Sequence, residues 1–426
     1  MAKRETKERK PNWTEMYASV DEIKDFLGNR IFLRHNVITR RVEYRMPSSF
    51  TQDFQPDWQP IDDRIVNSLW ARLSRDRRAR VQDVYRVIES DYVPDFNPFS
   101  SYLEQLPPWD GSNNILVLSL SVKVKGNADQ QMLFFKYLRK WLVGMVAGWI
   151  DPTEVNHEIL VLIGNQGIYK TTWFQYLLPP ELRNYFYTKT NANRMSKDDL
   201  LTLAQYGLVC CEELDTMRPH ELNQLKAAVT MQNIDERAAY AHFHEHRKHI
   251  ASFCGTGNNV QFLTDATGNR RWLPFEVESI NNPRTHPIDY KGVFAEAYSL
   301  YQQGFCHWVK SNEMDQLCLH NEQFESTLPE MEKISENFRL PRPGDQVEFV
   351  TRTNVFEAIC STPLLHLDIN NISPAMKRLG FESTRTKRAR GWWVYRYSDM
   401  ERQENRRQRM GTAVDGGEGD NDDIIF

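Results

Sequence analysis

The stretch 159–172 constrains the fold of this chain more than any other. Residues 159–163 form an unbroken aliphatic run, which predicts a buried parallel strand. A loop containing Gly164 and Gly167 follows, and then Lys170 with a hydroxyl residue directly after it. Gly164 and Lys170 stand six residues apart. This spacing predicts a phosphate-binding loop that leads into a helix.

The residue types in this loop suit ATP and Mg²⁺. Glycines let backbone N–H groups turn towards phosphate oxygens, and the N-terminus of the helix adds partial positive charge. We expect Lys170 to contact the β- and γ-phosphates and the Thr171 hydroxyl to bind Mg²⁺. Tyr169 stands where a glycine usually precedes the lysine. The alternative is a glycine turn after a core strand with an unrelated lysine. The predicted nucleotide-binding residues are Gly164, Asn165, Gln166, Gly167, Ile168, Tyr169, Lys170, Thr171 and Thr172.

A second apolar run, 207–211, ends in paired carboxylates. Such a pair is what a magnesium–nucleotide site needs at the carboxyl edge of a strand. We assign Glu212 to the metal and Glu213 to activation of water, with Asp215 as a weaker candidate. Acidic residues are also common where loops begin. The pair lies about forty residues after the phosphate loop, as a doubly wound sheet requires.

Two further polar groups complete the expected site. The apolar run 250–257 ends in Asn258, whose amide could position the attacking water beside the γ-phosphate; Asn259 is the second choice. An asparagine-rich turn is the alternative. Arg270 and Arg271 precede another strand and could neutralise the γ-phosphate, within one subunit or from a neighbouring one. A surface ion pair is the alternative for these arginines.

Composition limits the classes of protein that fit. The formal net charge is −4 and 40% of the residues are hydrophobic, as in ordinary soluble globular proteins. Contacts with nucleic acid must therefore come from local patches. The six cysteines form no CxxC pair, and we find no signal peptide and no transmembrane segment. We predict a cytoplasmic protein with reduced thiols and no membrane partner.

Apolar periodicity and proline-rich turns divide the chain into six expected parts. The central part is expected to be an α/β P-loop ATPase. Arginines between residues 61 and 88 are read as a solvated helix face, with a basic rim facing nucleic acid as the alternative. The expected parts are a flexible basic arm (1–12), a mainly helical N-terminal domain (13–110), the ATPase domain (111–310), a helical connector and linker (311–345), a winged-helix-like domain (346–400) and a disordered tail (401–426).

These motifs, in this order, resemble the virulence-associated protein E family, a branch of P-loop ATPases related to superfamily 3 helicases and the AAA+ class. The resemblance covers about residues 95–300, and it implies ATP hydrolysis in the replication of phages and other mobile elements. Members often stand beside or are fused to a primase. The N-terminal region is too short for one here, so priming would need another protein. The motifs that carry the resemblance are 106–111, 164–171, 212–215, 225–226, 255–258 and 262–271.

The resemblance to superfamily 3 also gives a role to residues 234–249. Relatives carry there a β-hairpin that projects into the pore of a hexamer and grips DNA. Basic and imidazole groups cluster around Tyr240 and Phe243, which suits phosphate contact with base stacking. Metal binding by four histidines, His249 among them, is the alternative. The predicted DNA contacts of this segment are Tyr240, His242, His244, His246, Arg247 and Lys248.

The C-terminal third predicts a compact domain. Helices at 353–359 and 372–381, a basic turn and an aromatic strand at 391–397 suggest a winged helix. A protein-interaction winged helix with a solvated basic face is the alternative. The predicted DNA contacts of this domain are Lys377, Arg378, Arg385, Lys387 and Arg388.

The leading hypothesis is an oligomeric ATPase motor, a hexameric ring that moves on or unwinds single-stranded or forked DNA. Nucleotide would lie between subunits, with the arginines supplied by the next subunit. A different class of function is an ATP-switched DNA-binding initiator or regulator that never unwinds. A third is an interaction module in which Tyr169 blocks a degenerate site. The intact Lys-Thr pair and the paired glutamates argue against this third hypothesis.

Overall fold

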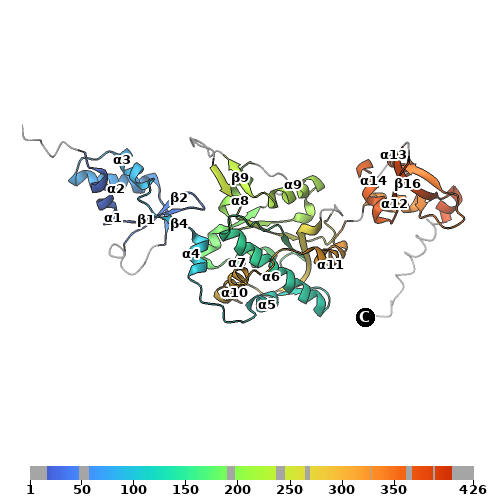
Figure 1. Cartoon of the computed structure of the whole chain (residues 1–426), viewed down its shortest axis with the longest axis horizontal. Helices are drawn as coiled ribbons and strands as arrows, with labels where there is room; N and C mark the ends of the chain where they lie inside the picture. The colour runs from blue at the N-terminus through green and yellow to red at the C-terminus, as the bar shows by residue number, and fades with distance from the viewer. Residues whose placement is uncertain are drawn as a thin grey trace, which may run out of the picture. The chain divides into compact units, whose positions relative to one another are not determined.

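The computed structural model has a mixed α/β fold with several sheets (Figure 1). The chain forms two compact units, one made of residues 1–258 and 271–314 and the other of residues 259–270 and 315–426. The structure describes residues 17–47, 57–189, 197–236, 245–263, 269–326, 328–360, 367–386 and 389–404.

The N-terminal part of the first unit combines helices with a small sheet. Ser19 begins the first helix through a reciprocal capping box with Glu22, and the Asp62 side chain caps the second. Ile23, Leu27 and their neighbours form the core beneath the sheet. The sheet, with strand order β3-β2-β1-β4, is an addition to the mainly helical domain expected here. The elements are α1 (Val20–Gly28), β1 (Phe32–Asn36), β2 (Arg41–Arg45), β3 (Gln59–Pro60), α2 (Asp63–Asp76), α3 (Val81–Ile88), β4 (Asp95–Phe96) and α4 (Pro98–Glu104).

A six-stranded sheet with the order β5-β12-β6-β11-β8-β7 forms the centre of the first unit. Five strands run parallel, and β5 is antiparallel to β12 at one edge. Every residue of the central strand β6 is buried, which explains its aliphatic sequence. The strands are β5 (Val122–Val124), β6 (Ile159–Ile163), β7 (Phe186–Lys189), β8 (Leu208–Cys211), β11 (Ser252–Gly257) and β12 (Trp272–Ile280).

The longest helix, α6 (Ala128–Ile150), packs on this sheet. Trp141 donates its indole N–H to the carbonyl of Phe253 at 3.0 Å, and Trp149 donates to that of Gly207 at 3.1 Å. This contact confirms the expectation that the aromatic stripe of residues 129–150 is core. Within the described residues no helix has the length and apolarity needed to cross a membrane. The other helices of the unit are α5 (Asn114–Ser119), α7 (Lys170–Leu177), η3 (Pro180–Tyr185), α8 (Lys197–Gln205), η4 (Leu214–Thr216), α9 (Pro219–Val229) and α10 (Tyr290–Gln302).

An ion-paired carboxylate fixes the segment that follows α10 against α6. Glu313 lies 2.9 Å from Lys136 and 3.2 Å from Lys140. Burial opposes ionisation of Glu313, but hydrogen bonds from Lys136, the Lys310 backbone and Lys140 outweigh it and lower its pKa to about 2. The carboxylate is therefore charged whenever the protein is folded near neutral pH.

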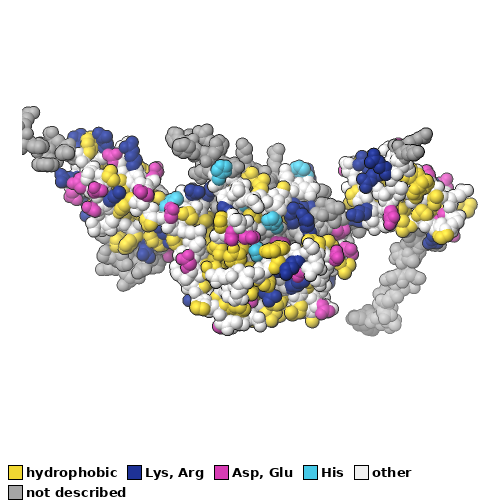
Figure 2. Space-filling model, in the orientation of Figure 1, with side chains coloured by type: hydrophobic (Ala, Val, Ile, Leu, Met, Phe, Trp, Pro, Cys, Tyr) yellow, Lys and Arg dark blue, Asp and Glu magenta, His cyan; other side chains and the backbone are white. Residues whose placement is uncertain are grey.

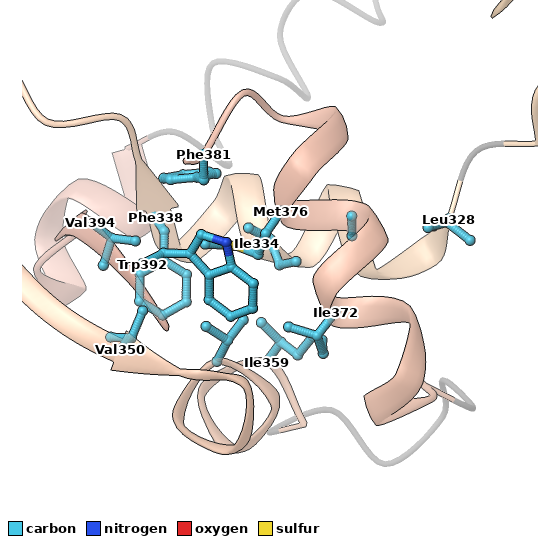
Figure 3. Close-up of a cluster of buried hydrophobic side chains, with 12 residues drawn as sticks. Leu328, Ile334, Phe338, Val350, Ile359, Ile372, Met376, Phe381, Trp392 and Val394 are labelled. Atoms are coloured by element: carbon cyan, nitrogen blue, oxygen red, sulfur yellow. The ribbon is translucent and has the colours of Figure 1, made fainter. Parts of the chain in front are cut away.

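The second unit has its own core, drawn in Figure 3, in which Trp392 and Phe338 lie among aliphatic side chains. Ile334 of α12 and Phe338 of β13 belong to this core, although 311–345 was expected to be a connector. The domain therefore begins before residue 346, because the apolar side chains of α12 are buried in it. Its elements are α11 (Ser311–Glu322, which begins in the first unit), α12 (Pro329–Asn337), β13 (Phe338–Arg339), β14 (Glu348–Thr351), α13 (Arg352–Ile359), η6 (Ile369–Asn371), α14 (Ile372–Arg378), β15 (Ser383–Arg385) and β16 (Arg390–Arg396).

Candidate functional site

The loop 164–169 leaves the carboxyl end of β6 and enters α7, as the sequence predicted. Gly164 has no room for a side chain, because an added Cβ would lie 2.6 Å from the carbonyl oxygen of Val277. The backbone N–H of Gly164 donates to the carbonyl of Gly257 at 3.2 Å, which ties the loop to β11. Asn165 and Gln166 are exposed, so the outer side of the loop faces solvent. Ile168, Thr171 and Thr172 are partly buried.

Tyr169 takes the left-handed backbone conformation, with φ 69° and ψ 19°. Glycine adopts these angles freely, and other residues do so at a cost. The backbone at this position has the left-handed conformation that a glycine would adopt, although Tyr169 carries a Cβ. The side chain is 40% exposed and so does not fill the loop.

Lys170 is the first residue of α7, and only 8% of it is exposed. Its ammonium group donates to the carbonyls of Gly164 and Asn165, both at 2.7 Å, and to the side-chain oxygen of Asn258 at 3.3 Å. Burial lowers the pKa of Lys170, and the charge of Asp215 acts in the opposite direction. The structure thus brings the predicted lysine and asparagine together at one edge of the sheet.

Thr171 and Glu212 also meet at this edge. The Thr171 hydroxyl donates to a carboxylate oxygen of Glu212 at 2.8 Å, and so connects the first turn of α7 to the end of β8. A hydroxyl and a carboxylate this close are the hard oxygen ligands that Mg²⁺ prefers. The residues present therefore fit the predicted magnesium ion. Glu213, the predicted water-activating residue, is exposed and has a left-handed backbone with φ 54°.

Arg270 and Arg271 lie in the short helix η5 (Asn269–Arg271); Arg270 is exposed and Arg271 is partly buried. Arg271 precedes β12, whose first residue Trp272 pairs with Ile159, the first residue of β6. Arg271 therefore lies near the amino end of β6, whereas the loop 164–169 follows its carboxyl end. Five residues of strand span roughly 16 Å. Arg271 is thus at the opposite edge of the sheet from the loop of its own chain.

The predicted DNA hairpin has the expected strands at its base. β9 (Asn233–Glu236) pairs antiparallel with β10 (Glu245–Lys248). Tyr240, His242 and His244 lie outside the described residues. His246 is exposed on β10.

Two of the predicted DNA contacts in this hairpin have structural roles instead. Arg247 is buried and donates to the carbonyl of Ile38 at 2.6 Å. Lys248 donates to the carbonyls of Gly148, at 2.7 Å, and Asp151, at the end of α6. Each cation of this pair donates to backbone carbonyls of the protein, which favours a structural role over the predicted phosphate contact. In the sequence, both residues stand close before the core strand β11. This position could have indicated that they anchor the hairpin to the rest of the protein.

The predicted basic patch of the second unit is also corrected at one residue. Arg378 is ion-paired with Glu325 at 3.2 Å and donates to the carbonyl of Ser326 at 2.7 Å, so it is not available to DNA as predicted. Lys377 and Arg385 are exposed. Lys387 and Arg388 lie outside the described residues. Lys and Arg side chains gather on one part of the surface of this unit in Figure 2.

Fold and site together place the chain among mixed α/β proteins in which a glycine loop presents lysine and threonine at the carboxyl edge of a parallel sheet. Residues 103–326, more than half of the chain, match the virulence-associated protein E-like domain. The chain belongs to this family.

Solved structures were also compared with the chain. One, described as the A form apo structure of the NrS-1 C-terminal region, is 13% identical and has a TM-score of 0.44; the match covers 88% of this chain and 98% of that one. Another structure, described as the apo structure of the same region, is 12% identical with a TM-score of 0.43, and covers 91% and 100%. Curated proteins gave no match.

Proposed function

We propose that this chain is an ATP-hydrolysing oligomeric motor, a helicase or translocase that acts on DNA during the replication of a phage or other mobile element. The observation that carries the proposal is the meeting of Lys170, Asn258 and the Thr171–Glu212 pair at the carboxyl edge of the sheet. Open parallel sheets bind ligands at this edge. The family to which the chain belongs supports the link to mobile elements.

Different residues of this edge would bind the nucleotide, hold Mg²⁺ and orient the attacking water. Lys170 already makes three hydrogen bonds to oxygen atoms of the protein, and phosphate oxygens would replace them. Thr171 and Glu212 would hold Mg²⁺, which supplies charge neutralisation on phosphate oxygens when bound. Glu213 is exposed and free to act as the base that orients water. Asn258 stands beside the lysine and would hold that water in place.

The distant position of Arg271 supports a site shared between subunits. An arginine at the amino end of β6 does not reach phosphates held by the loop at the carboxyl end of the same strand. In a hexameric ring, the neighbouring subunit would supply Arg271, with Arg270 as the alternative. Guanidinium groups suit this task because they stay charged and match phosphate geometry.

The two DNA-contacting regions of the proposal lie outside this site. The hairpin formed by β9 and β10 would grip DNA with residues beyond its anchored base. In the second unit, the order from α12 to β16 is helix, strand, strand, helix, helix, strand, strand, with the short helix η6 before α14. The pair of helices followed by two antiparallel strands supports a winged-helix domain. Lys377 and Arg385, two of the predicted DNA contacts of this domain, are exposed.

Mixing two inactive variants tests the shared site. Lys170→Ala should abolish hydrolysis, and Arg271→Ala should leave ATP binding largely intact but lower turnover by on the order of 10³-fold. Each variant alone contains no complete site, whereas a mixed ring pairs an intact loop from one protein with an intact arginine from the other. Partial recovery of ATP hydrolysis on mixing is the expected result. Background activity at every ratio, with subunit exchange demonstrated, would refute sharing of the site.

A strand-displacement assay separates the motor from an ATP switch. A ring that hydrolyses ATP and displaces a strand from forked DNA fits the motor. Hydrolysis that responds to DNA without strand displacement or translocation would favour the initiator or regulator instead. Near-normal ATP hydrolysis by a correctly folded Lys170→Ala variant would contradict both the motor and the ATP-switched initiator or regulator.

A further inference from the structure

The small sheet of the N-terminal part has two different faces. Leu33, Val42 and Tyr44 point towards the core formed with α1, α2 and α3. Because paired residues of antiparallel strands share a face and neighbours alternate, the register places a different set on the other side. This set, called here the outer face, includes Phe32, Arg34, Asn36, Arg41, Glu43, Arg45, Trp58 and Phe96.

Arginines and aromatic rings lie against one another on the outer face. The guanidinium carbon of Arg34 lies 4.2 Å from the ring centre of Trp58 and 3.6 Å from that of Phe96. The corresponding carbon of Arg45 lies 5.1 Å from Trp58 and 5.5 Å from Phe32. Phe32 is 47% exposed, although it is a large apolar side chain. Cation–π contacts of this kind hold the rings in fixed positions on the sheet.

The outer face keeps uncompensated positive charge. Its carboxylate, Glu43, is already engaged, because it pairs with Arg34 at 2.6 Å and accepts a hydrogen bond from Asn36 at 2.7 Å. Among the described residues, no carboxylate forms an ion pair with Arg41 or Arg45. The described part of the face therefore presents two cations without an ion-paired carboxylate, next to the exposed ring of Phe32 and the partly buried ring of Trp58.

A cavity of about 310 Å³ continues the outer face. Arg41 and Trp58 line it from the sheet, and Gln205 and Tyr206, at the end of α8, line it from the opposite side. Sites for small ligands begin at about 300 Å³. Glu43, whose charge is paired with Arg34, also lines the cavity, as do Asn184 and Tyr185. The cavity thus combines an arginine and an ion-paired carboxylate with three aromatic rings and two amides, in a space that accommodates a single nucleotide.

We propose that the outer face binds single-stranded nucleic acid, with bases stacked on Phe32 and Trp58, phosphates on Arg41 and Arg45, and one nucleotide in the cavity beside Tyr206. Proteins that bind single strands combine aromatic platforms with positive charge in this way. Bases of a duplex are stacked on one another and are not available to the rings. This inference rests on the proposed function only for the class of partner, which is nucleic acid. The outer face itself lies outside the candidate ATPase site.

Binding of a labelled oligothymidylate, measured by fluorescence anisotropy without ATP, tests the proposal. Trp58→Ala should weaken binding by about 5- to 150-fold, which is the range for one stacked base. The double variant Arg41→Ala/Arg45→Ala should lower the slope of log affinity against log salt by about 1.4, since each phosphate contact contributes about 0.7. Because no ATP is present, the result does not depend on whether the chain hydrolyses ATP.

Matched controls lie elsewhere on the first unit. Trp308→Ala removes an exposed indole, and Arg86→Glu changes the charge of an exposed arginine on α3. Both should bind like the wild type. Thermal unfolding establishes that each variant is folded. Wild-type affinity of the folded Trp58→Ala and double-arginine variants would overturn the proposal. Dissociation of the oligomer by these variants, with single-strand affinity per chain unchanged, would also overturn it, because the face would then be a subunit interface.

Discussion

The left-handed backbone of Tyr169 gives a prediction whose size follows from the structure. A residue with a Cβ at φ 69° and ψ 19° costs about 1–2 kcal/mol relative to its right-handed conformation. The ring is 40% exposed, so its packing contributes little to the fold. Most of the effect of substitution at this position should therefore come from the backbone.

The comparison of Tyr169→Gly with Tyr169→Ala isolates this backbone contribution. Both variants lack the ring, but alanine keeps the Cβ and its strain. Glycine removes the strain and adds freedom to the unfolded chain, which offsets about 0.5–1 kcal/mol of the gain. We expect Tyr169→Gly to be more stable than Tyr169→Ala by about 0.5–1 kcal/mol, after both terms are combined.

Chemical unfolding of the three proteins, followed by tryptophan fluorescence, measures the difference. Gly304→Ala is the matched control: Gly304 has φ 75°, and an added Cβ would meet nothing within 4 Å, so this variant should lose stability through the backbone alone. If Tyr169→Ala equals or exceeds Tyr169→Gly in stability while the control behaves as expected, the backbone at Tyr169 is not held in the left-handed region. The loop would then differ from the phosphate-binding geometry on which the site depends.

Three further predictions concern the two candidate catalytic carboxylates, acid stability and the packing beneath the candidate site. Glu213→Gln should bind ATP yet lose turnover in a steady-state assay, and if Glu212→Gln alone does so the two roles are exchanged. The lowered pKa of Glu313 contributes stability that is present above its unfolded pKa of 4.5 and is lost as the pH falls towards 2. Glu313→Gln should therefore flatten the decline of unfolding free energy over this window, by about 1–3 kcal/mol in total; an unchanged pH profile would contradict the pairing. Gly255→Ala would place a Cβ 2.1 Å from the side chain of Leu214, and should cost about 1–3 kcal/mol in thermal unfolding, whereas a neutral result would mean that the leucine moves freely.

The sequence predicted the edge of the central sheet well, because each candidate site residue there follows a buried apolar strand. The run before Gly164, the run before Glu212 and the run before Asn258 are all strands of one parallel sheet. Parallel strands bring their carboxyl ends to the same edge, so the pattern of each strand also places the side chain that follows it. The contacts of Lys170 with Asn258 and of Thr171 with Glu212 follow from this rule.

The sequence was least informative where charged residues are buried. Arg247, Lys248 and Arg378 look like DNA contacts in the sequence, but they donate to carbonyls of the protein or pair with Glu325. Their partners lie between about 50 and 210 residues away along the chain, and local pattern contains no information on contacts at that distance. The outer face of the N-terminal sheet was missed for a related reason. Two of its strands, β3 and β4, have only two residues each and show no alternation, and their partners lie elsewhere in the sequence.

Residues 259–270 belong to the second unit, although residues of the first unit flank them in the sequence. This arrangement has a consequence for the order in which the chain is synthesised. Phe262 and Leu263 donate backbone hydrogen bonds to the carbonyl of Phe324, at 3.0 and 2.9 Å, and Asn269 donates to Glu325 at 2.6 Å. When residues 259–270 leave the ribosome, about sixty residues remain to be made before these partners exist. Recombination that exchanges the second unit through a single crossover near residue 314 would separate the segment from its partners. Homologous exchange of this unit alone should therefore require three crossovers, near residues 258, 270 and 314.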